Sequence, residues 1–343
     1  MSSTETEIPM TMKAAVVHKI GDPTTSDVIS VDEDVPVPTP GEGEILVAVH
    51  AAAMNPIDWK LLKGAFPGQK LGPKFGFDVS GVVVSIGPNT TTDLKVGDEV
   101  YADVAPSFGT FAQYALVKAI ALAKKPKNIS MVQAAALPLA GLTAIQGLLN
   151  QGNLEKGQKV LIFGGSGGVG SLAVQIAKAM GASEVYSTGS DVDMIKRLGA
   201  DVVVNYKEQS LMEALKGKEF DVVYDTIGGY EHWEIAQASL KKNGTFVTIA
   251  GDGDKSFPVI LGKIMWRKLS ALIFGTPRYQ FFLTDTKDTV GASMQKMTEL
   301  VESGSVKPVL DDKQYELTTD GVHAMIKRSM THRAKGKLVV KVA

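Results

Sequence analysis

The sequence predicts an α/β protein with two domains. A mostly β domain is built from both ends of the chain, and a domain with a doubly wound parallel sheet of six strands is inserted between these two segments. Three observations support this fold class. The chain has 343 residues, more than one hydrophobic core usually supports, so two domains are expected. Up to about residue 125, short β-branched runs are separated by Gly, Pro and Asp. From about 135 to 275, apolar strands alternate with helical segments.

The N-terminal domain is predicted over residues 1–134, with residues 277–343 returning to it. Its strand-like runs are "KAAVVH", "EILVAVHAAA", "VSGVVVSIG", "DEVYADV" and "FAQYALV". The tail offers a helix, "TVGASMQKMTELVESG", then "YELTTDGVHAMIKRSM" and a closing strand, "GKLVVKV". Because this tail is too small to fold alone, we expect it to pack on the N-terminal β domain.

The second domain is predicted over residues 135–276. Its six strands are expected in "KVLIFG", "EVYSTG", "DVVVNY", "FDVVYDTIGG", "GTFVTIAG" and "LSALIFG". Strands that alternate with helices in this way are typical of a doubly wound parallel sheet.

The composition narrows the class of partner. The chain is 44% hydrophobic and 21% charged, with a net charge of -1, so it lacks the overall basic field that attracts nucleic acid or an anionic membrane surface. Small molecules are therefore the expected partners. The absence of cysteine excludes disulfides, thiolate nucleophiles and cysteine-ligated metal sites.

A cytoplasmic location and no membrane partner are predicted. The first dozen residues have neither the basic start and apolar stretch of a signal peptide nor the arginines of a transit peptide. The longest weakly apolar region, 131–149, contains Gln133, Pro138 and Gln146 and falls short of a membrane span.

The stretch "VLIFGGSGGVGSLAVQIAKAMGA", residues 160–182, joins an apolar strand, a glycine-rich turn and an amphipathic helix. In the G-x-G-x-x-G interpretation, Gly165 permits the tight turn, Gly167 lets a pyrophosphate approach the backbone and Gly170 lets the helix pack on the strand. Free N–H groups at the helix start would face the phosphates. The turn residues assigned to this site are Gly165, Ser166, Gly167, Gly168, Val169 and Gly170. The alternative is a purely structural glycine loop, but the β/α context favours dinucleotide binding.

The end of the next strand favours NADPH over NADH. An NAD site normally places an acid there, about 20 residues after the glycines, to bind the ribose hydroxyls. Here the strand ends in Thr188, Gly189 and Ser190, which leave room for a 2′-phosphate. Asp191 could be the acid displaced by a few residues, or it could cap the helix that follows, which we favour.

These motifs resemble the zinc-free quinone oxidoreductase and enone reductase branch of the medium-chain dehydrogenase/reductase superfamily, over about residues 12–342. The resemblance rests on "AAAMNPIDWKLLKG", "GFDVSGVVVSIG", "KVGDEVYA", "GTFAQYALV", "AAALPLAGLTA", "GGSGGVGSLAVQIAK", "LGADVVVNY" and "RAKGKLVVKV". It implies a GroES-like domain from both chain ends with a Rossmann domain inserted. Zinc-dependent relatives carry Cys and His where this chain has "MNPIDW" and "GFD", so no metal site is expected.

The resemblance also implies catalytic residues. It places Asn55 beside the nicotinamide and substrate, and Lys60 near where many relatives have an active-site Tyr, so a mechanism that relies on a Tyr acid is in doubt. Lys60 could donate to the substrate oxygen or simply face solvent. Asp58 is a candidate acid/base group or a turn cap, and Asp78 is expected to hold the fold rather than touch substrate.

Further cofactor contacts follow from the same match and from strand ends at the carboxyl edge of the sheet. Thr143 is expected near the nicotinamide, unless it only bonds its own helix backbone. Thr188, Ser190, Lys196 and Tyr206 are expected around the adenosine 2′-phosphate. The remaining candidates along the cofactor are Ile227, Ala250, Phe281, Phe282 and Lys335; two adjacent Phe residues could equally be core.

The predicted activity is metal-free, NADPH-dependent reduction of α,β-unsaturated carbonyls or quinones. Alcohol oxidation would need a zinc or a base relay, whereas the β-carbon of an enone is already electrophilic and needs only a positioned hydride donor and a stabilised oxygen. One alternative is a 2-enoyl thioester reductase, for which Lys70 and Lys74 would supply a basic rim. Another is a non-catalytic NADPH-binding protein. The resemblance also allows a homodimer joined through the Rossmann domain.

Overall fold

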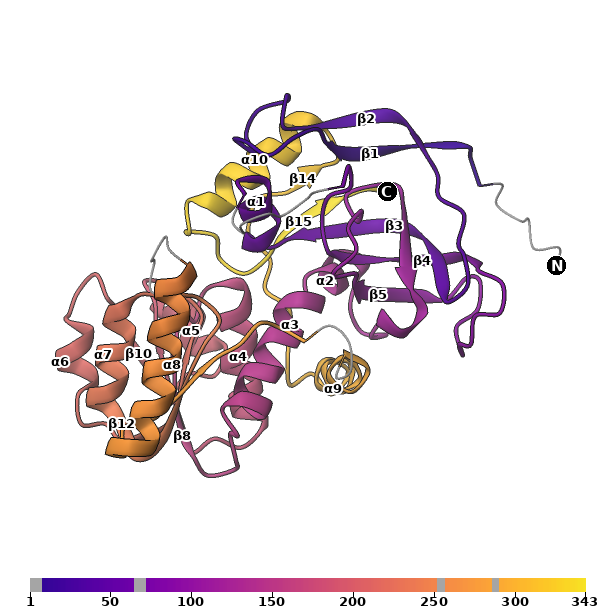
Figure 1. Ribbon diagram of the computed structural model, residues 1–343. Helices are drawn as coiled ribbons and strands as arrows, with labels where there is room; N and C mark the ends of the chain where they lie inside the picture. Colours follow the sequence, from indigo (N-terminus) through magenta and orange to yellow (C-terminus); the bar gives the residue numbers. More distant parts are fainter. Residues whose placement is uncertain (1–7, 65–71, 252–256, 286–289) are drawn as a thin grey trace. The chain divides into compact units, whose positions relative to one another are not determined.

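The protein consists of two compact units, seen in a computed structural model that describes residues 8–64, 72–251, 257–285 and 290–343 (Figure 1). Unit 1 comprises Met1–Leu139, Thr286–Thr298 and Leu310–Ala343, and unit 2 comprises Ala140–Asp285 and Glu299–Val309. The expected domain borders at 134/135 and 276/277 lie five and nine residues before the borders of these units, at 139/140 and 285/286. The sequence pattern also gave no sign that 299–309 belongs to unit 2.

Unit 1 contains two β-sheets, in which every strand pairing is antiparallel except that of β14 with β15, which is parallel. Its described strands are β1 (Thr11–Val17), β2 (Ile29–Pro36), β3 (Glu44–Met54), β4 (Asp78–Ile86), β5 (Glu99–Asp103), β6 (Tyr114–Lys118), β7 (Leu122–Lys124), β14 (Tyr315–Glu316) and β15 (Leu338–Lys341). β1 and β2 form one sheet, and the other has the order β14-β15-β3-β4-β5-β7, with β6 pairing β3. Neither β2 nor β7 was among the predicted strands.

The end of the chain returns to the N-terminal sheet, as predicted. Strand β15 pairs antiparallel with β3, placing Leu338 opposite Met54. On the other side of β3, Ala53 lies opposite Asp78 of β4, and Asp78 in turn lies opposite Asp103 of β5. Four adjacent strands thus begin or end at the same edge of this sheet.

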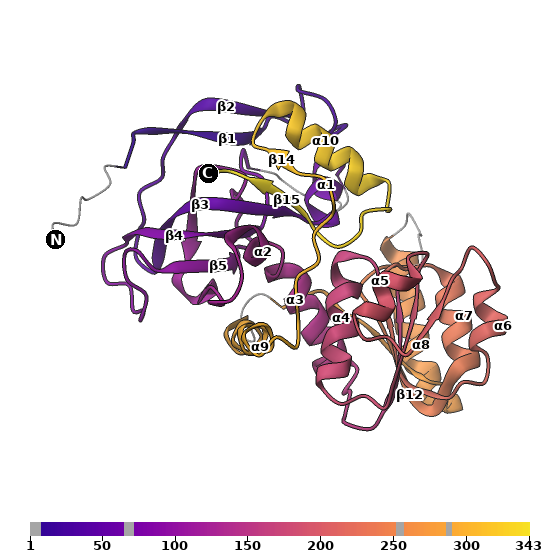
Figure 2. The ribbon, with the colours of Figure 1, turned by 180° about the vertical axis from the view of Figure 1, so that it is seen from behind.

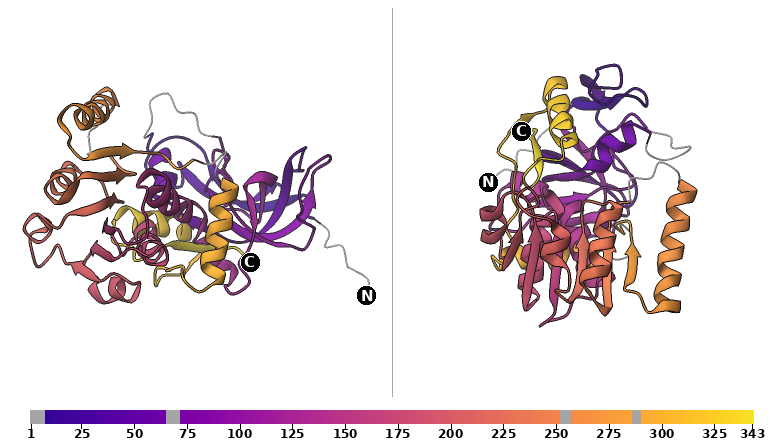
Figure 3. Two further views of the ribbon diagram at one scale, coloured as in Figure 1. Left: turned by 90° about the horizontal axis from the view of Figure 1, so that it is seen from below. Right: turned by 90° about the vertical axis from the view of Figure 1, so that its left-hand side faces the viewer.

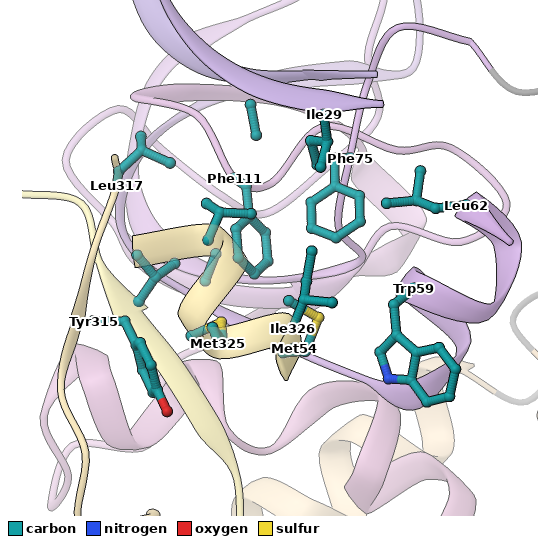
Figure 4. Close-up of a cluster of buried hydrophobic side chains, with 14 of the residues drawn as sticks. Ile29, Met54, Trp59, Leu62, Phe75, Phe111, Tyr315, Leu317, Met325 and Ile326 are labelled. Carbon is teal, nitrogen blue, oxygen red and sulfur yellow. The ribbon is translucent and has the colours of Figure 1, made fainter. Parts of the chain in front are cut away.

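A hydrophobic cluster fixes the short helix α1 (Pro56–Leu62) and the helix α10 (Thr319–Met330) on unit 1 (Figure 4). Trp59 and Leu62 of α1 and Met325 and Ile326 of α10 lie in this cluster, together with Phe75. The indole Nε1 of Trp59 donates to Ser329 Oγ at 3.0 Å. Because the first turn of α1 is anchored in this way, the residues at its N-terminus have a defined position.

Unit 2 is a six-stranded parallel sheet with helices on both faces. Its strands are β8 (Lys159–Phe163), β9 (Glu184–Thr188), β10 (Val202–Val204), β11 (Phe220–Asp225), β12 (Leu240–Thr248) and β13 (Arg278–Phe281). Their order is β10-β9-β8-β11-β12-β13, and every pairing is parallel. Helices α7 and α8 cover the face seen in Figure 1, and α4 and α5 cover the face seen from behind in Figure 2.

The helices of unit 2 connect these strands. They are α4 (Gly168–Ala179), α5 (Val192–Arg197), α6 (Leu211–Leu215), α7 (Tyr230–Ser239) and α8 (Phe257–Phe274). Helix α2 (Met131–Ala135) lies in unit 1, while α3 (Pro138–Ile145) and α9 (Val290–Glu302) run from unit 1 into unit 2. Two short helical turns, Ala119–Ala121 and Gln146–Gln151, complete the described elements.

The number of strands predicted for unit 2 is confirmed, but the sixth strand was misplaced. The run "LSALIFG", residues 269–275, falls mostly within α8, and the sixth strand is β13. A short apolar run cannot be assigned to a strand or to a helix from periodicity alone. The predicted border at residue 276 would have separated β13 from the sheet that it completes.

Candidate functional site

The glycine-rich turn between β8 and α4 has the geometry of a phosphate cradle. Gly164 has φ 85°, in the left-handed region that glycine adopts without strain. The backbone N–H of Gly165 donates to the Thr188 carbonyl at 3.0 Å, and that of Gly167 donates to the Gly164 carbonyl at 3.0 Å. The left-handed residue of the turn is therefore Gly164, whereas the sequence interpretation gave the tight turn to Gly165.

Three glycines of this turn serve different purposes. A Cβ at Gly165 would overlap the Ser187 hydroxyl, and a Cβ at Gly170 would overlap the Gly164 carbonyl. Gly170 thus lets α4 approach the end of β8 closely. At Gly167 a Cβ would meet only the Gly164 carbonyl, at 3.4 Å, so the space beside this residue is open.

The first turn of α4 fits a pyrophosphate. Ser166, Gly168 and Val169 are partly exposed, and the opening N–H groups of a 12-residue helix have no partners within the helix. Such groups, with the helix dipole, favour an anion. Because Gly167 leaves room for a phosphate to approach the backbone, the residues present fit a dinucleotide.

The end of β9 is free of acidic side chains. Thr188 is buried, and its Oγ1 accepts a hydrogen bond from the Gly164 N–H at 3.2 Å, so it supports the glycine turn from below. Ser190 is exposed. The Asp191 side chain accepts from the Met194 N–H at 3.1 Å and is the N-cap of α5. Asp191 is therefore the helix cap that the sequence favoured, and residues 188–190 at the strand end carry no acid.

The other residues expected around this phosphate are exposed on the same unit. Lys196 lies in the last turn of α5, and Tyr206, which follows β10, is 52% exposed. Strands β9 and β10 are parallel neighbours, with Thr188 opposite Val204. Their carboxyl ends therefore bring Ser190 and Tyr206 to adjacent positions on one edge of the sheet.

A buried carboxylate that the sequence interpretation missed organises the ends of β11 and β12. Asp225 accepts hydrogen bonds from the backbone N–H groups of Ile227 and Gly228, from Thr248 Oγ1 at 3.0 Å and from His232 Nδ1 at 2.9 Å. These bonds hold the loop that carries Ile227, which is 55% exposed. The residue was hidden in the quoted strand "FDVVYDTIGG", where only Ile227 was selected.

The remaining cofactor candidates are distributed over both units. In unit 2, Thr143 Oγ1 hydrogen-bonds Thr284 Oγ1 at 2.7 Å, so its hydroxyl is not confined to its own helix backbone. Ala250 is partly buried and its N–H donates to Thr248 Oγ1 at 3.2 Å. Of the two adjacent phenylalanines, Phe281 is partly exposed and packs on the hydrophobic core of unit 2, whereas Phe282 is buried. Lys335 is exposed and belongs to unit 1, where its backbone N–H donates to Asp311.

A buried polar cluster in unit 1 surrounds Asn55, the residue that precedes α1. Its Oδ1 accepts from Lys337 Nζ at 2.6 Å, and its Nδ2 donates to Asp78 Oδ2 at 2.9 Å. Lys337 and Asp78 also form an ion pair at 3.0 Å, and Asp78 Oδ1 accepts from the Leu139 N–H at 2.8 Å. All members of the cluster are buried. Lys337 was missed although the quoted motif "RAKGKLVVKV" contains it.

Two more carboxyl groups complete this cluster. Asp58 Oδ2 accepts from the Asn55 N–H at 2.6 Å, so Asp58 has a capping role at the start of α1, as the sequence favoured, while Asn55 itself is the N-cap residue. Burial raises the pKa of Asp58 well above its usual value. Burial, and then the neighbouring charge of Asp78, raise the pKa of Asp103 to about 7. Asp58 Oδ1 and Asp103 Oδ2 have no hydrogen-bond partner among the described residues.

Lys60 lies outside this cluster. Its side chain is exposed on α1, with Nζ 5.8 Å from the centre of the Trp59 ring. The surrounding protein partly desolvates its ammonium group and lowers its pKa. A lysine in this position is accessible to a small molecule and loses its proton more readily than a fully hydrated one.

Comparison with known proteins decides the family. Residues 41–127 match the alcohol dehydrogenase GroES-like domain and residues 198–340 match the zinc-binding dehydrogenase domain. The chain is 36% identical to a 2-methylene-furan-3-one reductase of Solanum lycopersicum, over 99% of this chain and 81% of that protein. This chain belongs to the medium-chain dehydrogenase/reductase superfamily. The resemblance inferred from its motifs, and the GroES-like plus Rossmann fold, are thereby confirmed.

Two further members of the superfamily bear on chemistry. A chloroplastic NADPH-dependent alkenal/one oxidoreductase of Arabidopsis thaliana is 35% identical, over 98% of this chain and 81% of that protein. The crystal structure of Escherichia coli quinone oxidoreductase complexed with NADPH superimposes with a TM-score of 0.81 at 26% identity, covering 96% of this chain and 99% of that one. Both names join a nicotinamide coenzyme to reduction of an enone or a quinone.

Proposed function

We propose that this protein is an NADPH-dependent reductase of α,β-unsaturated carbonyls or quinones that works without a metal ion. The observation that carries this proposal is the pairing of two features. One is a glycine turn followed by a strand end without an acid, and the other is a buried amide, Asn55, within the motif whose resemblance implies a position beside substrate. The names of the relatives at 36% and 35% identity support the same activity.

Unit 2 supplies the binding site for the dinucleotide in this proposal. The turn at residues 164–170 holds the pyrophosphate, and Ser190, Lys196 and Tyr206 surround the 2′-phosphate. Thr188, which was also expected there, is buried and supports the turn instead. Thr143, Ile227, Ala250, Phe281 and Phe282 contact the rest of the molecule, and Lys335 of unit 1 adds a contact to phosphate. When bound, NADPH supplies a hydride for the β-carbon of the substrate.

Unit 1 supplies the groups that act on the substrate oxygen. The Asn55 amide donates a hydrogen bond to the carbonyl oxygen as negative charge develops there; a single donor of this kind is worth about 3–4 kcal/mol. Lys60, exposed and with a lowered pKa, donates the proton that completes the product. An enone makes no further demand on the protein, since conjugation already makes its β-carbon electrophilic.

The activity assay separates this proposal from its alternatives. Purified protein is mixed with NADPH and a panel of enones, quinones and 2-enoyl thioesters, and loss of the reduced-nicotinamide absorbance is followed. We expect turnover of enones or quinones. Tight NADPH binding without turnover of any panel member would instead identify a binding protein.

The thioester reductase remains the second enzymatic candidate. Lys74 is exposed, as a basic rim requires, whereas Lys70 lies outside the described residues. A preference for enoyl thioesters over free enones by more than about tenfold in kcat/KM would favour this alternative, since the carrier phosphates would then contribute binding energy.

We also propose that the protein is a homodimer joined through unit 2. Helix α8 lies beside β13, the edge strand of the sheet as described (Figure 3, right). The exposed apolar side chains of α8 are Val259, Leu261, Met265, Trp266, Leu269 and Ile273. Its opposite side is fixed to the unit, because Arg267 is buried and donates to Tyr279 Oη at 3.0 Å. An apolar helix face beside an unpaired strand edge is typical of a subunit contact.

Light scattering of a variant pair tests the dimer. Met265→Glu is expected to convert the protein into a monomer, because it puts a charge into the apolar face. Ile120→Glu is the matched control, since Ile120 is an exposed apolar residue of unit 1, 76% exposed against 63% for Met265. A monomeric parent protein, or a Met265→Glu variant that stays dimeric, would contradict this interface, and binding of the parent monomer to lipid vesicles would assign the face to a membrane instead.

The cytoplasmic location stays a prediction. Among the described residues, none of the helices has both the length and the hydropathy that a membrane crossing requires.

A further inference from the structure

The cluster around Asn55 is assembled from four adjacent strands of unit 1. Asn55 follows β3, Asp78 begins β4, Asp103 ends β5 and Lys337 precedes β15. The sheet order β15-β3-β4-β5 brings these ends together at one edge, although Asn55 and Lys337 are 282 positions apart in the sequence. The position of each group is therefore set by the strand register and not by a mobile loop.

The charges of the cluster are balanced around the Asn55 amide. Burial raises the pKa of Asp58 and of Asp103. The carboxylate of Asp78 receives hydrogen bonds from Lys337, from Asn55 and from the backbone N–H of Leu139. The buried ammonium of Lys337 thus has one close ionic partner, Asp78, and one neutral partner, Asn55.

These two charges select one orientation of the amide. The Lys337 ammonium has only donors, so it requires the Asn55 oxygen on its side. The Asp78 carboxylate has only acceptors, so it requires the Asn55 nitrogen on the other. Rotating the amide by half a turn would place like groups against each other on both sides, at distances of 2.6 and 2.9 Å. One of the two N–H groups of Asn55 Nδ2 donates to Asp78. The second N–H has no acceptor among the residues described here.

We propose that Lys337 and Asp78 are positioning residues for the reaction: together they lock the Asn55 amide so that its second N–H is held ready to donate to the substrate oxygen. This inference rests on the proposed function, because it assigns Lys337 a role only if Asn55 acts on substrate. Neither residue touches the substrate. A fixed donor spares the reaction the cost of reorienting the amide as charge develops, which is how a preorganised donor differs from a freely rotating one.

A double-variant cycle tests the proposal. Lys337→Gln removes the charge and offers the amide a partner that can bind either end, so kcat for an enone is expected to fall about tenfold to hundredfold. Asn55→Ala alone is expected to lower kcat further. In the Asn55→Ala/Lys337→Gln variant, kcat should equal that of Asn55→Ala within about threefold, because Lys337 acts through Asn55.

Two controls accompany the cycle. Lys337→Arg keeps the charge and should recover most of kcat. The dissociation constant for NADPH, measured by calorimetry, should stay within about twofold of the parent value in every variant, since the dinucleotide is held by unit 2. If Lys337→Gln does not fold, Asp78→Asn/Lys337→Gln replaces it in the cycle, because this pair removes both buried charges together.

The outcomes are distinct. Full kcat in Lys337→Gln, or losses that multiply in the double variant, would overturn the positioning role and leave Lys337 as a support of the fold. An inactive parent protein would overturn the proposed function itself. Non-additive losses with unchanged NADPH binding would establish the role.

Discussion

Unit 1 and unit 2 each gather polar groups at one edge of a sheet, but they do so by opposite means. At the edge of unit 2, neutral hydroxyls and glycine backbone face outward, and Asp225 is the buried carboxylate that orders a loop. At the edge of unit 1, one lysine, one amide and three carboxyl groups are buried together. The arrangement in unit 2 leaves backbone N–H donors available for an anion. In unit 1, the charged groups of Lys337 and Asp78 hydrogen-bond a single side chain, that of Asn55, and fix its orientation.

The difference fits a division of work between the units. A dinucleotide carries its own charge, so a site for it needs open N–H groups and space. A developing substrate oxygen is small, and a group that stabilises it must be fixed before the reaction begins. Each unit can therefore be disabled separately, and four predictions use this separation.

The largest effect is expected at Asn55. Asn55→Ala should lower kcat about 100- to 1,000-fold, or about 3–4 kcal/mol, because it removes the donor to the substrate oxygen. Steady-state kinetics with an enone measure kcat, and calorimetry measures the affinity for NADPH. Equal losses in kcat and in NADPH affinity would contradict the assignment of these two functions to separate units.

A pH-dependent effect of similar size is expected at Asp103. Its pKa rises from an ordinary 3.8 to about 7 on folding, so the folded protein binds more protons than the unfolded chain between these values and its stability falls as pH rises through this window. Asp103→Asn should remove on the order of 3 kcal/mol of this decline. Urea unfolding of both proteins at pH 4.5, 6 and 8 measures this decline in the free energy of unfolding. A decline of the same size in Asp103→Asn would show that another group causes it.

The glycine turn should separate stability from binding. Gly170→Ala brings a Cβ against the Gly164 carbonyl, and we expect it to destabilise the protein by about 1–3 kcal/mol. Gly167→Ala meets no such obstacle but narrows the space for a phosphate, so it should weaken NADPH at least tenfold at an unchanged urea midpoint. The reverse pattern would mean that the phosphate does not approach at Gly167.

The smallest effect is expected at Asp191. Asp191→Ala should cost about 1 kcal/mol through loss of the helix cap, and Asp191→Ser should restore most of it. Neither variant should change the preference for NADPH over NADH, because the Asp191 carboxylate already serves the Met194 N–H. A preference that shifts towards NADPH in Asp191→Ala would show that this acid acts on the ribose after all.

The parts of the molecule that follow local patterns were predictable from the sequence. The strand, glycine turn and helix at 159–179 are contiguous, and five of the six strands of unit 2 occur where the apolar runs predicted them. The sixth was misplaced because "LSALIFG" suits a strand and a helix equally.

Side-chain partners that lie far apart in the sequence could not be predicted from local patterns. The sequence interpretation selected Asn55 but gave it no partner, because its two partners lie 23 and 282 positions away. In the closing motif the sequence interpretation selected Lys335, which is exposed, and not Lys337, which is buried. The local sequence does not indicate which of the two lysines is buried. Asp103 carries no signal of its own, since its raised pKa comes from burial and from a neighbour on the next strand.

The position of Lys337 has a consequence for how the polypeptide is made. Synthesis proceeds from the N-terminus, so Asn55, Asp78 and Asp103 leave the ribosome long before Lys337, the ionic partner of Asp78, and the whole of unit 2 is translated in between. Until β15 arrives to pair with β3, the carboxylates at this edge have no buried counterion, and water must keep them hydrated. All six strands of unit 2 lie within residues 159–281, so the whole of that sheet has been synthesised before β15, which the sheet of unit 1 still needs.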